Sequence, residues 1–368
     1  MKKLKLKKIE LSLKNLFDKL IYKKVNTKFI EKPTYFLSFF EGSKILLLRN
    51  DRIGDLIVST PFIYTIRKYN PNVTIDILLS EKNIVAKRAV ENYVNNIYVF
   101  RKKLFSLIKL VFILKKQKYD LVIDLFDNHS TTNALLIKLI KPLYSLGFRK
   151  HKANFYNIEV PLPNKLKHHI VARLNNLLFP FGIESHNITN KLIYNLTDLE
   201  IKEAINLVGH KNKPFRLGIN ISGSNNSKNW GTSNYIEFIE RVLLYFDEYE
   251  ILIFNANDDL KSIPKLILNP DIKFAPETNN FNLFAAMVKT CDILLSPDTA
   301  VVHLAAAFQI PCIGLYTFTG SKDTGIPWTP YNSPNKCVKT KTSELKQITI
   351  EAVYEAFEEL IAEKNLYE

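Results

Sequence analysis

The amino-acid sequence predicts an α/β protein built from two doubly wound domains, each with a sheet of parallel strands. Short apolar runs alternate with helical stretches along most of the 368 residues, which is typical of parallel strands joined by helices. This alternation begins near residue 44 and begins again near residue 215, which indicates two domains of similar size. A hydrophobic content of 46% is enough for a sizeable core.

The first domain is expected over residues 44–188. Its apolar runs are short enough for buried strands, and the periodic stretches between them suit helices. Strands are expected at 44–50, 73–80, 95–100, 119–126 and 145–148, and helices at about 56–69, 104–117 and 130–140.

The second domain, expected over residues 189–345, repeats the same order of elements. Strands are expected at 215–222, 249–256, 291–297 and 311–317, and helices at about 233–246, 281–290 and 298–308. The C-terminal segment, residues 346–368, holds a last helix at 348–365, whose apolar face consists of Ile350, Val353, Phe357, Leu360 and Ile361.

The composition limits the classes of partner. Lys and Arg number 51 against 36 Asp and Glu, so the formal net charge of +15 favours a nucleic acid, a membrane surface or a phosphorylated substrate. Nucleic acid is disfavoured, since the sequence carries no RNP, zinc-finger or helix-turn-helix signature. Three cysteines without a CxxC pair (Cys291, Cys312 and Cys337) argue against a disulfide framework or a zinc site and fit a reducing compartment.

Residues 1–43 precede the first domain as an extension in which a basic amphipathic helix is expected. Residues 1–44 hold 12 Lys against 4 acids, so just over half of the net charge lies there. The helix either lies on an anionic membrane through residues 1–30 or packs on the protein by the same apolar stripe. No run is long enough for a transmembrane helix, and no cleavable signal follows the basic start. The stripe consists of Leu6, Ile9, Leu13, Leu16, Phe17, Leu20 and Ile21.

Loops at the carboxyl ends of the strands form the candidate site, because ligands of open α/β sheets bind there. The first such loop, Arg49–Asp55, lacks the GxGxxG and GxxxxGK[ST] patterns of nucleotide-binding loops. Asp55 would stand at a helix start and act as a base, while Arg49 or Arg52 and nearby backbone N–H groups hold an anion. Alternatively, Asp55 only caps the helix.

A second candidate loop joins the third strand of the second domain to a helix. The free backbone N–H groups of Thr299, Ala300 and Val301 would bind a phosphate or diphosphate. Asp298 would orient a sugar hydroxyl beside them or cap the helix. His303 is either functional or structural, as a single helical histidine commonly is.

Two further loops follow strands of the second domain. Ser222–Trp230 is rich in hydroxyls and amides, and its Lys228 could neutralise a phosphate or a leaving-group oxygen, whereas Trp230 is expected to be a core anchor. Asp258 and Asp259 follow the next strand and would bind ribose hydroxyls or lie in a solvated loop. No HExxH, GxSxG or Cys/His nucleophile arrangement occurs.

Three of these segments resemble glycosyltransferase family 9, the bacterial lipopolysaccharide heptosyltransferases, in the right order and over about residues 44–345. KILLLRNDRIGDLIVSTPFIYTIRKYNP resembles the opening of the family, with its Gly-Asp turn and a Thr-Pro pair, here Thr60-Pro61. SPDTAVVHLAAAFQIPCIGLY resembles the second signature of the family, and SKNW its Lys-x-Trp region. The sequence departs from the family at Ala300, where Gly is usual, in the Tyr-Thr-Phe-Thr-Gly segment after the strand that follows Pro311, and in the N-terminal extension.

The resemblance implies a GT-B fold, in which two Rossmann-like domains face a cleft and the last helix crosses back to the first domain. It implies an inverting transfer of a heptose from ADP-heptose to a phosphorylated glycolipid, the lipopolysaccharide or lipooligosaccharide core, with no metal and no cofactor required. Asp55 matches the general base of the family, and Lys228 matches a lysine near the donor phosphates that would assist catalysis.

The resemblance also divides the remaining site residues between the two substrates. On the acceptor side we expect Arg49, Arg52 and Gly54. The nucleotide-sugar would be bound by Ser222, Lys228, Asp258, Asp259, Asp298, Thr299, Ala300, Val301 and His303.

Two alternatives share these features. The same fold could use another nucleotide-sugar for surface polysaccharide synthesis, or the chain could be a non-catalytic membrane-associated scaffold. The basic extension predicts a cytoplasmic enzyme bound peripherally to the inner face of the inner membrane, where a lipid acceptor would be found.

Overall fold

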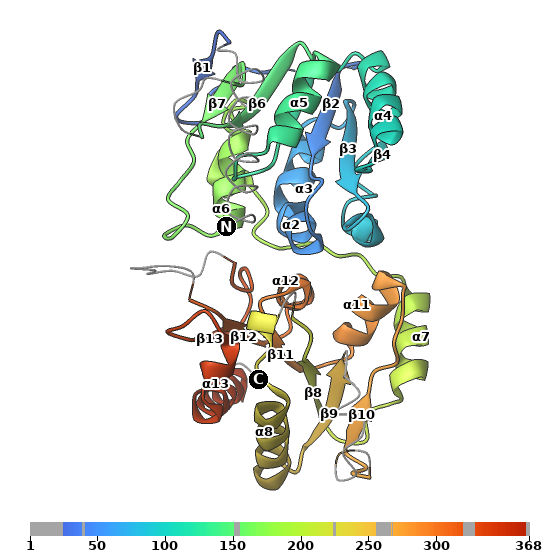
Figure 1. Ribbon diagram of the computed structural model, residues 1–368, viewed down its shortest axis with the longest axis vertical. Coiled ribbons are helices and arrows are strands. Elements are labelled where there is room, and N and C mark those ends of the chain that lie inside the picture. The colour runs from blue at the N-terminus through green and yellow to red at the C-terminus, as the bar shows by residue number, and fades with distance from the viewer. Residues whose placement is uncertain are drawn as a thin grey trace, which may run out of the picture. The chain divides into compact units, whose positions relative to one another are not determined.

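The computed structural model describes residues 25–38, 41–150, 155–223, 226–254, 266, 268–318 and 328–365. The chain divides into two compact units. The first holds the residues up to Thr189 except Val85–Ala89 and Lys165–His169, which belong to the second unit together with Asn190–Glu368. Each unit contains one sheet of parallel strands with helices packed beside it (Figure 1). The predicted α/β class with two doubly wound domains is therefore confirmed.

The first sheet has seven strands in the order β1-β7-β6-β5-β2-β3-β4. From β2 outward the chain adds β3 and β4 on one side and then β5, β6 and β7 on the other, so its winding reverses between β2 and β5. Such a reversal is the switch point of a doubly wound sheet, beside which ligands bind. The strands are β1 (Lys28–Phe29), β2 (Lys44–Leu48), β3 (Thr74–Ser80), β4 (Asn96–Phe100), β5 (Leu121–Asp124), β6 (Tyr144–Phe148) and β7 (Ile158–Val160).

One helix of the first unit differs from the prediction in a way that matters for the site. The stretch expected as a single helix at 56–69 forms two, because Ser59 ends the first and Pro61, which has no backbone N–H, stands in the first turn of the second. The first of them begins at Ile53, so Asp55 is its third residue. The helical elements up to residue 187 are α2 (Ile53–Val58), α3 (Thr60–Tyr69), η1 (Ile84–Ala89), α4 (Leu104–Lys116), α5 (Thr131–Ile140), α6 (Ile170–Asn175), η2 (Asn176–Leu178) and η3 (Ser185–Asn187).

Residues 28–37 are part of the first unit, whereas the sequence predicted a separate extension over residues 1–43. β1 pairs in parallel with β7, a three-residue strand that the prediction missed because so short a run shows no alternation. Ile30 and Leu37 are buried, and the Phe36 N–H donates to the carbonyl oxygen of Pro180 at 3.0 Å. The apolar stripe of the expected amphipathic helix lies outside the described residues.

The second sheet repeats the topology of the first. Its strand order is β10-β9-β8-β11-β12-β13, so the winding reverses between β8 and β11. The strands are β8 (Phe215–Asn220), β9 (Tyr249–Phe254), β10 (Ile272–Phe274), β11 (Ile293–Pro297), β12 (Cys312–Tyr316) and β13 (Asn335–Lys339). The helical elements are α7 (Asp198–Val208), η4 (Asn226–Lys228), α8 (Thr232–Tyr245), α11 (Phe281–Lys289), α12 (Ala300–Phe308), η5 (Leu345–Gln347) and α13 (Ile350–Asn365).

Helix α13 packs in the core of the second unit, whereas the prediction had it cross back to the first domain. Val353 and Phe357 are buried in one hydrophobic cluster with Trp230 and with Phe238 of α8. Trp230 Nε1 donates to the carbonyl oxygen of Ile348 at 2.9 Å, which confirms that Trp230 is a core anchor. The apolar face of the helix was predicted correctly, but the surface that buries it belongs to the second unit itself.

Candidate functional site

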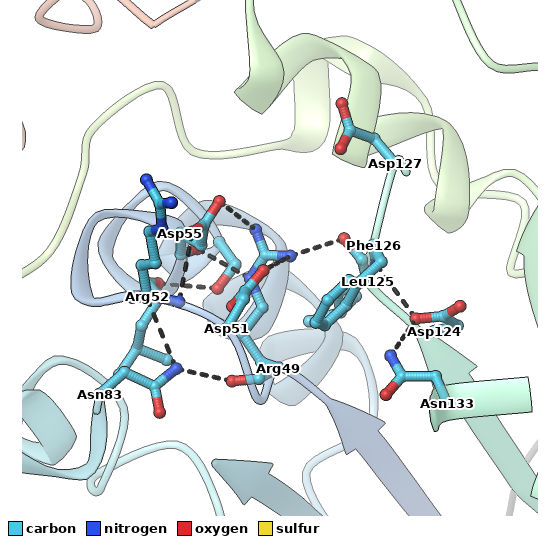
Figure 2. Close-up of polar contacts among 12 residues, drawn as sticks. Arg49, Asp51, Arg52, Asp55, Asn83, Asp124, Leu125, Phe126, Asp127 and Asn133 are labelled. Carbon is cyan, nitrogen blue, oxygen red and sulfur yellow. Dashed lines mark hydrogen bonds and ion pairs between the residues drawn. The ribbon is translucent and has the colours of Figure 1, made fainter. Parts of the chain in front are cut away.

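The first candidate site lies where β2 and β5 end, at the switch point of the first sheet. Arg49 directly follows β2, and Leu125 directly follows β5. Arg49 Nη1 donates to the carbonyl oxygen of Leu125 at 2.7 Å, which ties the two strand ends together (Figure 2). Asn83 holds the same loop from the side of β3, since its Nδ2 donates to the Arg49 carbonyl oxygen at 2.7 Å.

The guanidinium of Arg49 stands between two carboxylates. Its Nη1 is 3.2 Å from Asp51 Oδ2, and its Nη2 is 3.9 Å from Asp55 Oδ1. Its Nε donates to the backbone carbonyl oxygen of Asp55 at 2.8 Å. Arg49 is only 1% exposed, so the expected direct contact with an acceptor does not fit its burial. Its contacts place it among the residues that organise the loop.

Asp51 is a carboxylate that the sequence analysis did not select. Its Oδ1 is buried and has no hydrogen-bond partner within the described parts of the chain. Burial raises the pKa of Asp51 to about 7; the charges of Asp55 and Asp124 act in the same direction, and Arg49 opposes them. A group with such a pKa can take up or release a proton near neutral pH. The sequence feature that could have pointed to Asp51 is its position as a second acid in the loop after β2.

The structure shows the capping role of Asp55, and its role as a base stays a prediction. Its Oδ2 accepts a hydrogen bond from the backbone N–H of Arg52 at 3.3 Å, just ahead of α2, which is a capping contact. The Asp55 side chain is 20% exposed, so the carboxylate can also be reached from outside. Arg52 is exposed, and Gly54 lies within the first turn of α2. These two residues are neighbours of Asp55, and their contact with an acceptor stays a prediction.

A buried polar cluster surrounds Asp124 at the end of β5, next to the strand that leads into the Arg49–Asp55 loop. Asp124 accepts hydrogen bonds from Asn133 Nδ2 at 2.8 Å, from the Tyr156 hydroxyl at 2.5 Å and from Lys150 Nζ at 3.2 Å. Asp124 is fully buried, so these donors replace the water that its carboxylate has lost. The charge fixed there contributes to the raised pKa of Asp51.

The second candidate site lies at the switch point of the second sheet, where β8 and β11 end. Asn220, the last residue of β8, donates from Nδ2 to Ser296 Oγ at 3.0 Å and to Thr299 Oγ1 at 3.2 Å. Its Oδ1 accepts a hydrogen bond from Ser222 Oγ at 3.0 Å. One buried amide therefore joins two loops that the sequence analysis selected separately.

Helix α12 begins at this junction. Thr299 is its N-cap, and Thr299 Oγ1 accepts a hydrogen bond from the Val301 N–H at 3.3 Å. The Val301 donor is thus already occupied, which differs from the prediction of three free N–H groups. Ala300 is the first residue of the helix, and the positive end of the helix dipole lies there, where an anion is stabilised.

Lys228 and Asp298 form an ion pair within the same two loops. Lys228 Nζ is 2.6 Å from Asp298 Oδ2 and donates to the Asp298 carbonyl oxygen at 2.9 Å. Both side chains are partly exposed, by 20% and 31%. Gly223 permits this arrangement, since a Cβ at Gly223 would collide with the Lys228 backbone. The Lys228 ammonium, fixed by Asp298 near the start of α12, is suited to binding a phosphate.

Three further residues were predicted to contact the donor, and only His303 lies within the described residues. His303 is 3% exposed, and its ring centroid is 6.1 Å from that of Trp328. This burial fits a structural histidine, and a donor role for it stays a prediction. Asp258 and Asp259 fall outside the described residues.

A pocket that the sequence analysis missed lies at the same edge of the second sheet. It begins at Phe254, the last residue of β9, and has a volume of about 350 Å³. That is enough for an aromatic ring system such as a nucleobase, and Phe254 and Phe284 supply apolar walls. Its lining consists of Phe254, Ala275, Pro276, Glu277, Thr278, Asn279 and Phe284.

Neither a metal centre nor a membrane span is visible in the part of the chain that the structure describes. No group of three His, Cys, Asp or Glu side chains there is arranged to hold a metal ion. None of the described helices is both long enough and apolar enough to cross a bilayer.

Two Rossmann-like domains with polar loops gathered at both switch points define a protein of the GT-B class. Solved structures show the same fold. The glycosyl transferase family 9 structure from Veillonella parvula DSM 2008 matches with a TM-score of 0.70 at 19% identity, covering 90% of this chain and 99% of that chain. Escherichia coli heptosyltransferase WaaC with ADP matches with a TM-score of 0.65 at 17% identity, covering 86% and 99%.

The chain belongs to glycosyltransferase family 9 (heptosyltransferase), whose sequence model matches residues 107–357. A relative in Escherichia coli K12 named "Putative lipopolysaccharide heptosyltransferase 4" is 27% identical over 329 residues, which cover 84% of this chain and 85% of the relative. The resemblance noted in the sequence is thereby confirmed, and the protein is a glycosyltransferase.

Proposed function

We propose that this protein transfers a heptose from ADP-heptose to a lipopolysaccharide or lipooligosaccharide core acceptor, with inversion at the anomeric carbon. Family membership supports the reaction class, and the names of its relatives support the acceptor. A family structure solved with ADP supports adenine as the nucleobase of the donor. The observation that carries the proposal is the Lys228–Asp298 pair at the start of α12, an arrangement suited to a diphosphate leaving group.

The second unit binds the donor in this proposal. The diphosphate lies at the N-terminus of α12, and Lys228 moves from Asp298 to the phosphate oxygens as the donor enters. Asp298 is then available to hold a sugar hydroxyl. The nucleobase occupies the pocket beside Phe254, and the acids predicted to bind ribose, Asp258 and Asp259, follow the same strand.

The first unit supplies the base. Asp55 accepts the proton of the acceptor hydroxyl while that oxygen forms the new bond to the anomeric carbon. The bond from that carbon to the diphosphate breaks on the opposite face, and its electrons leave with the diphosphate. Arg49 holds Asp55 in place, and Asp51, which precedes α2 in the same loop, is a second proton acceptor. No metal is required in this account, because Lys228 and the helix dipole stabilise the leaving group.

We further propose that the protein acts on the cytoplasmic side of the inner membrane, attached peripherally through residues 1–30. A lipid-linked acceptor would be found there. The basic composition of that segment supports the assignment.

A panel of nucleotide-sugars with mass-spectrometric detection of the product tests the proposal. Transfer from ADP-heptose alone, with the opposite anomeric configuration in the product, is the expected result. Transfer from a different nucleotide-sugar would show that ADP-heptose is not the donor, but it would leave the fold and the assignment of Asp55 as the general base unchanged. If no donor is transferred or hydrolysed, the chain is a non-catalytic scaffold and the proposal is wrong.

A further inference from the structure

Helix α4 exposes a row of large apolar side chains. Leu104 is 67% exposed, Phe105 86%, Ile108 57% and Phe112 59%. Their spacing places them on one side of the helix, since residues three and four apart are neighbours on its surface. The opposite side is buried, because Leu110 and other side chains of α4 belong to a core cluster of the first unit. The helix is therefore apolar on both its inner and its outer face.

The segment that contains this row is strongly basic. Between residues 101 and 118 there is no Asp or Glu. Lys116 Nζ lies 4.5 Å from the ring centroid of Phe112, so a cation stands directly beside the apolar row. The basic residues are Arg101, Lys102, Lys103, Lys109, Lys115, Lys116 and Lys118. An apolar row flanked by cations complements a surface that is anionic outside and apolar beneath.

The position of α4 connects this face with the first candidate site. The helix follows the carboxyl end of β4, an edge strand two places from β2 (Figure 1). Because β2, β3 and β4 are parallel, their carboxyl ends lie on the same side of the sheet. The first turn of α4 therefore lies on the side where Arg49 and Asp55 are found. A surface seated on Leu104 and Phe105 would therefore lie beside the acceptor side of the protein.

We propose that the outer face of α4 docks on an anionic lipid bilayer. The apolar side chains enter the boundary between headgroups and acyl chains, and the surrounding lysines contact anionic headgroups. This contact is separate from residues 1–30 and depends on no step of the proposed reaction. It would place a lipid-linked acceptor next to Asp55, which rests on the proposed function.

Sedimentation of the full-length protein with lipid vesicles tests the docking. One set of vesicles contains phosphatidylcholine alone, and the other adds phosphatidylglycerol. The test variant combines Phe105→Ser and Phe112→Ser. The matched control combines Leu199→Ser and Leu244→Ser, two exposed leucines on α7 and α8 of the second unit. Thermal melting shows that each variant is folded.

We expect the wild type and the control to bind the anionic vesicles alike. The phenylalanine variant should bind them at least roughly tenfold more weakly, because two buried aromatic side chains are lost from the contact. A second variant, Lys109→Gln with Lys115→Gln and Lys116→Gln, should bind anionic vesicles more weakly, with no such change for vesicles of phosphatidylcholine alone. Transfer to a soluble acceptor fragment should be unchanged in both, which separates this proposal from the proposed reaction.

Binding of the phenylalanine variant within about twofold of the wild type would overturn the proposal, since another part of the chain would then hold the membrane. So would a wild-type dimer in sedimentation velocity that the variant abolishes while vesicle binding persists. In that case the face would be an interface between copies of this chain.

Discussion

Arg49 donates a hydrogen bond from Nη1 to the carbonyl oxygen of Leu125 at 2.7 Å, so one buried side chain bridges the two strands at the switch point of the first sheet. The same side chain lies 3.2 Å from Asp51 and 3.9 Å from Asp55. A single guanidinium therefore links the two strand ends to both carboxylates of the loop.

Replacing Arg49 should destabilise the first unit strongly. Arg49→Gln leaves Asp51 and Asp55 without their cation, and breaking a buried ion pair in this way costs about 3–5 kcal/mol. Arg52→Gln is the matched control, because Arg52 is exposed and contributes a backbone contact that the substitution keeps. Urea unfolding of the two variants measures the difference. Equal stability of both would show that the buried position of Arg49 is unimportant.

Asp51 predicts an unusual pH dependence of stability. Its pKa in the folded protein is about 7, above the ordinary value of about 3.9, so the folded state holds a proton that the unfolded state releases between these values. The stabilisation from that proton is present at low pH and is lost as the pH rises towards 7 and beyond. Asp51→Asn should therefore melt at a higher temperature than the wild type at pH 8.

The advantage of Asp51→Asn should shrink steadily as the pH is lowered from 8 to 4. Melting curves of both proteins across this range provide the measurement. A difference that stays constant with pH would mean that the folded protein does not raise the pKa of Asp51.

Loss of Lys228 should weaken donor binding more than it affects folding. Lys228→Gln removes a charge-assisted contact with the diphosphate, worth about 1.5–3 kcal/mol, or roughly a tenfold to hundredfold increase in the Kd for ADP. Lys211→Gln is the matched control: it breaks another Lys–Asp pair of the second unit, with Asp292, which precedes β11 rather than following it. Titration calorimetry distinguishes the two. An unchanged Kd in Lys228→Gln would remove this lysine from the donor site.

The packing of α13 predicts which part of the protein loses stability when this helix packs less well. Phe357 is fully buried in the core cluster of the second unit, so Phe357→Ala should cost about 3–5 kcal/mol. Glu355→Ala, on the exposed side of the same helix, should change stability by about 0.5 kcal/mol or less. Hydrogen exchange should locate the loss in α8 and α13. Exchange that rises instead in the strands of the first sheet would restore the predicted crossing of this helix to the first domain.

The sequence was most informative where short, continuous apolar runs alternate with helical stretches. The central strands of both sheets and the loops after β2, β8 and β11 were predicted from such runs, because the carboxyl ends of parallel strands meet at one edge. The edge strands β1 and β13 were missed: β1 has only two residues, and β13, with five, is only partly buried and lacks an apolar run. The burial of Arg49 and the raised pKa of Asp51 depend on neighbours distant in the chain, so no local pattern could reveal them.

The turnover of Asp55→Asn tests whether Asp55 is the catalytic base. Asparagine keeps the size of the side chain and an oxygen for the hydrogen bond from the Arg52 N–H, but it cannot take the proton from the hydroxyl group of the acceptor. The account predicts that kcat falls by a factor of roughly 10²–10⁴ while the Kd for the donor is unchanged. Glu81→Gln, an exposed acid that lies after β3, should retain wild-type turnover. Near-normal turnover of Asp55→Asn would contradict the assignment of Asp55 as the base.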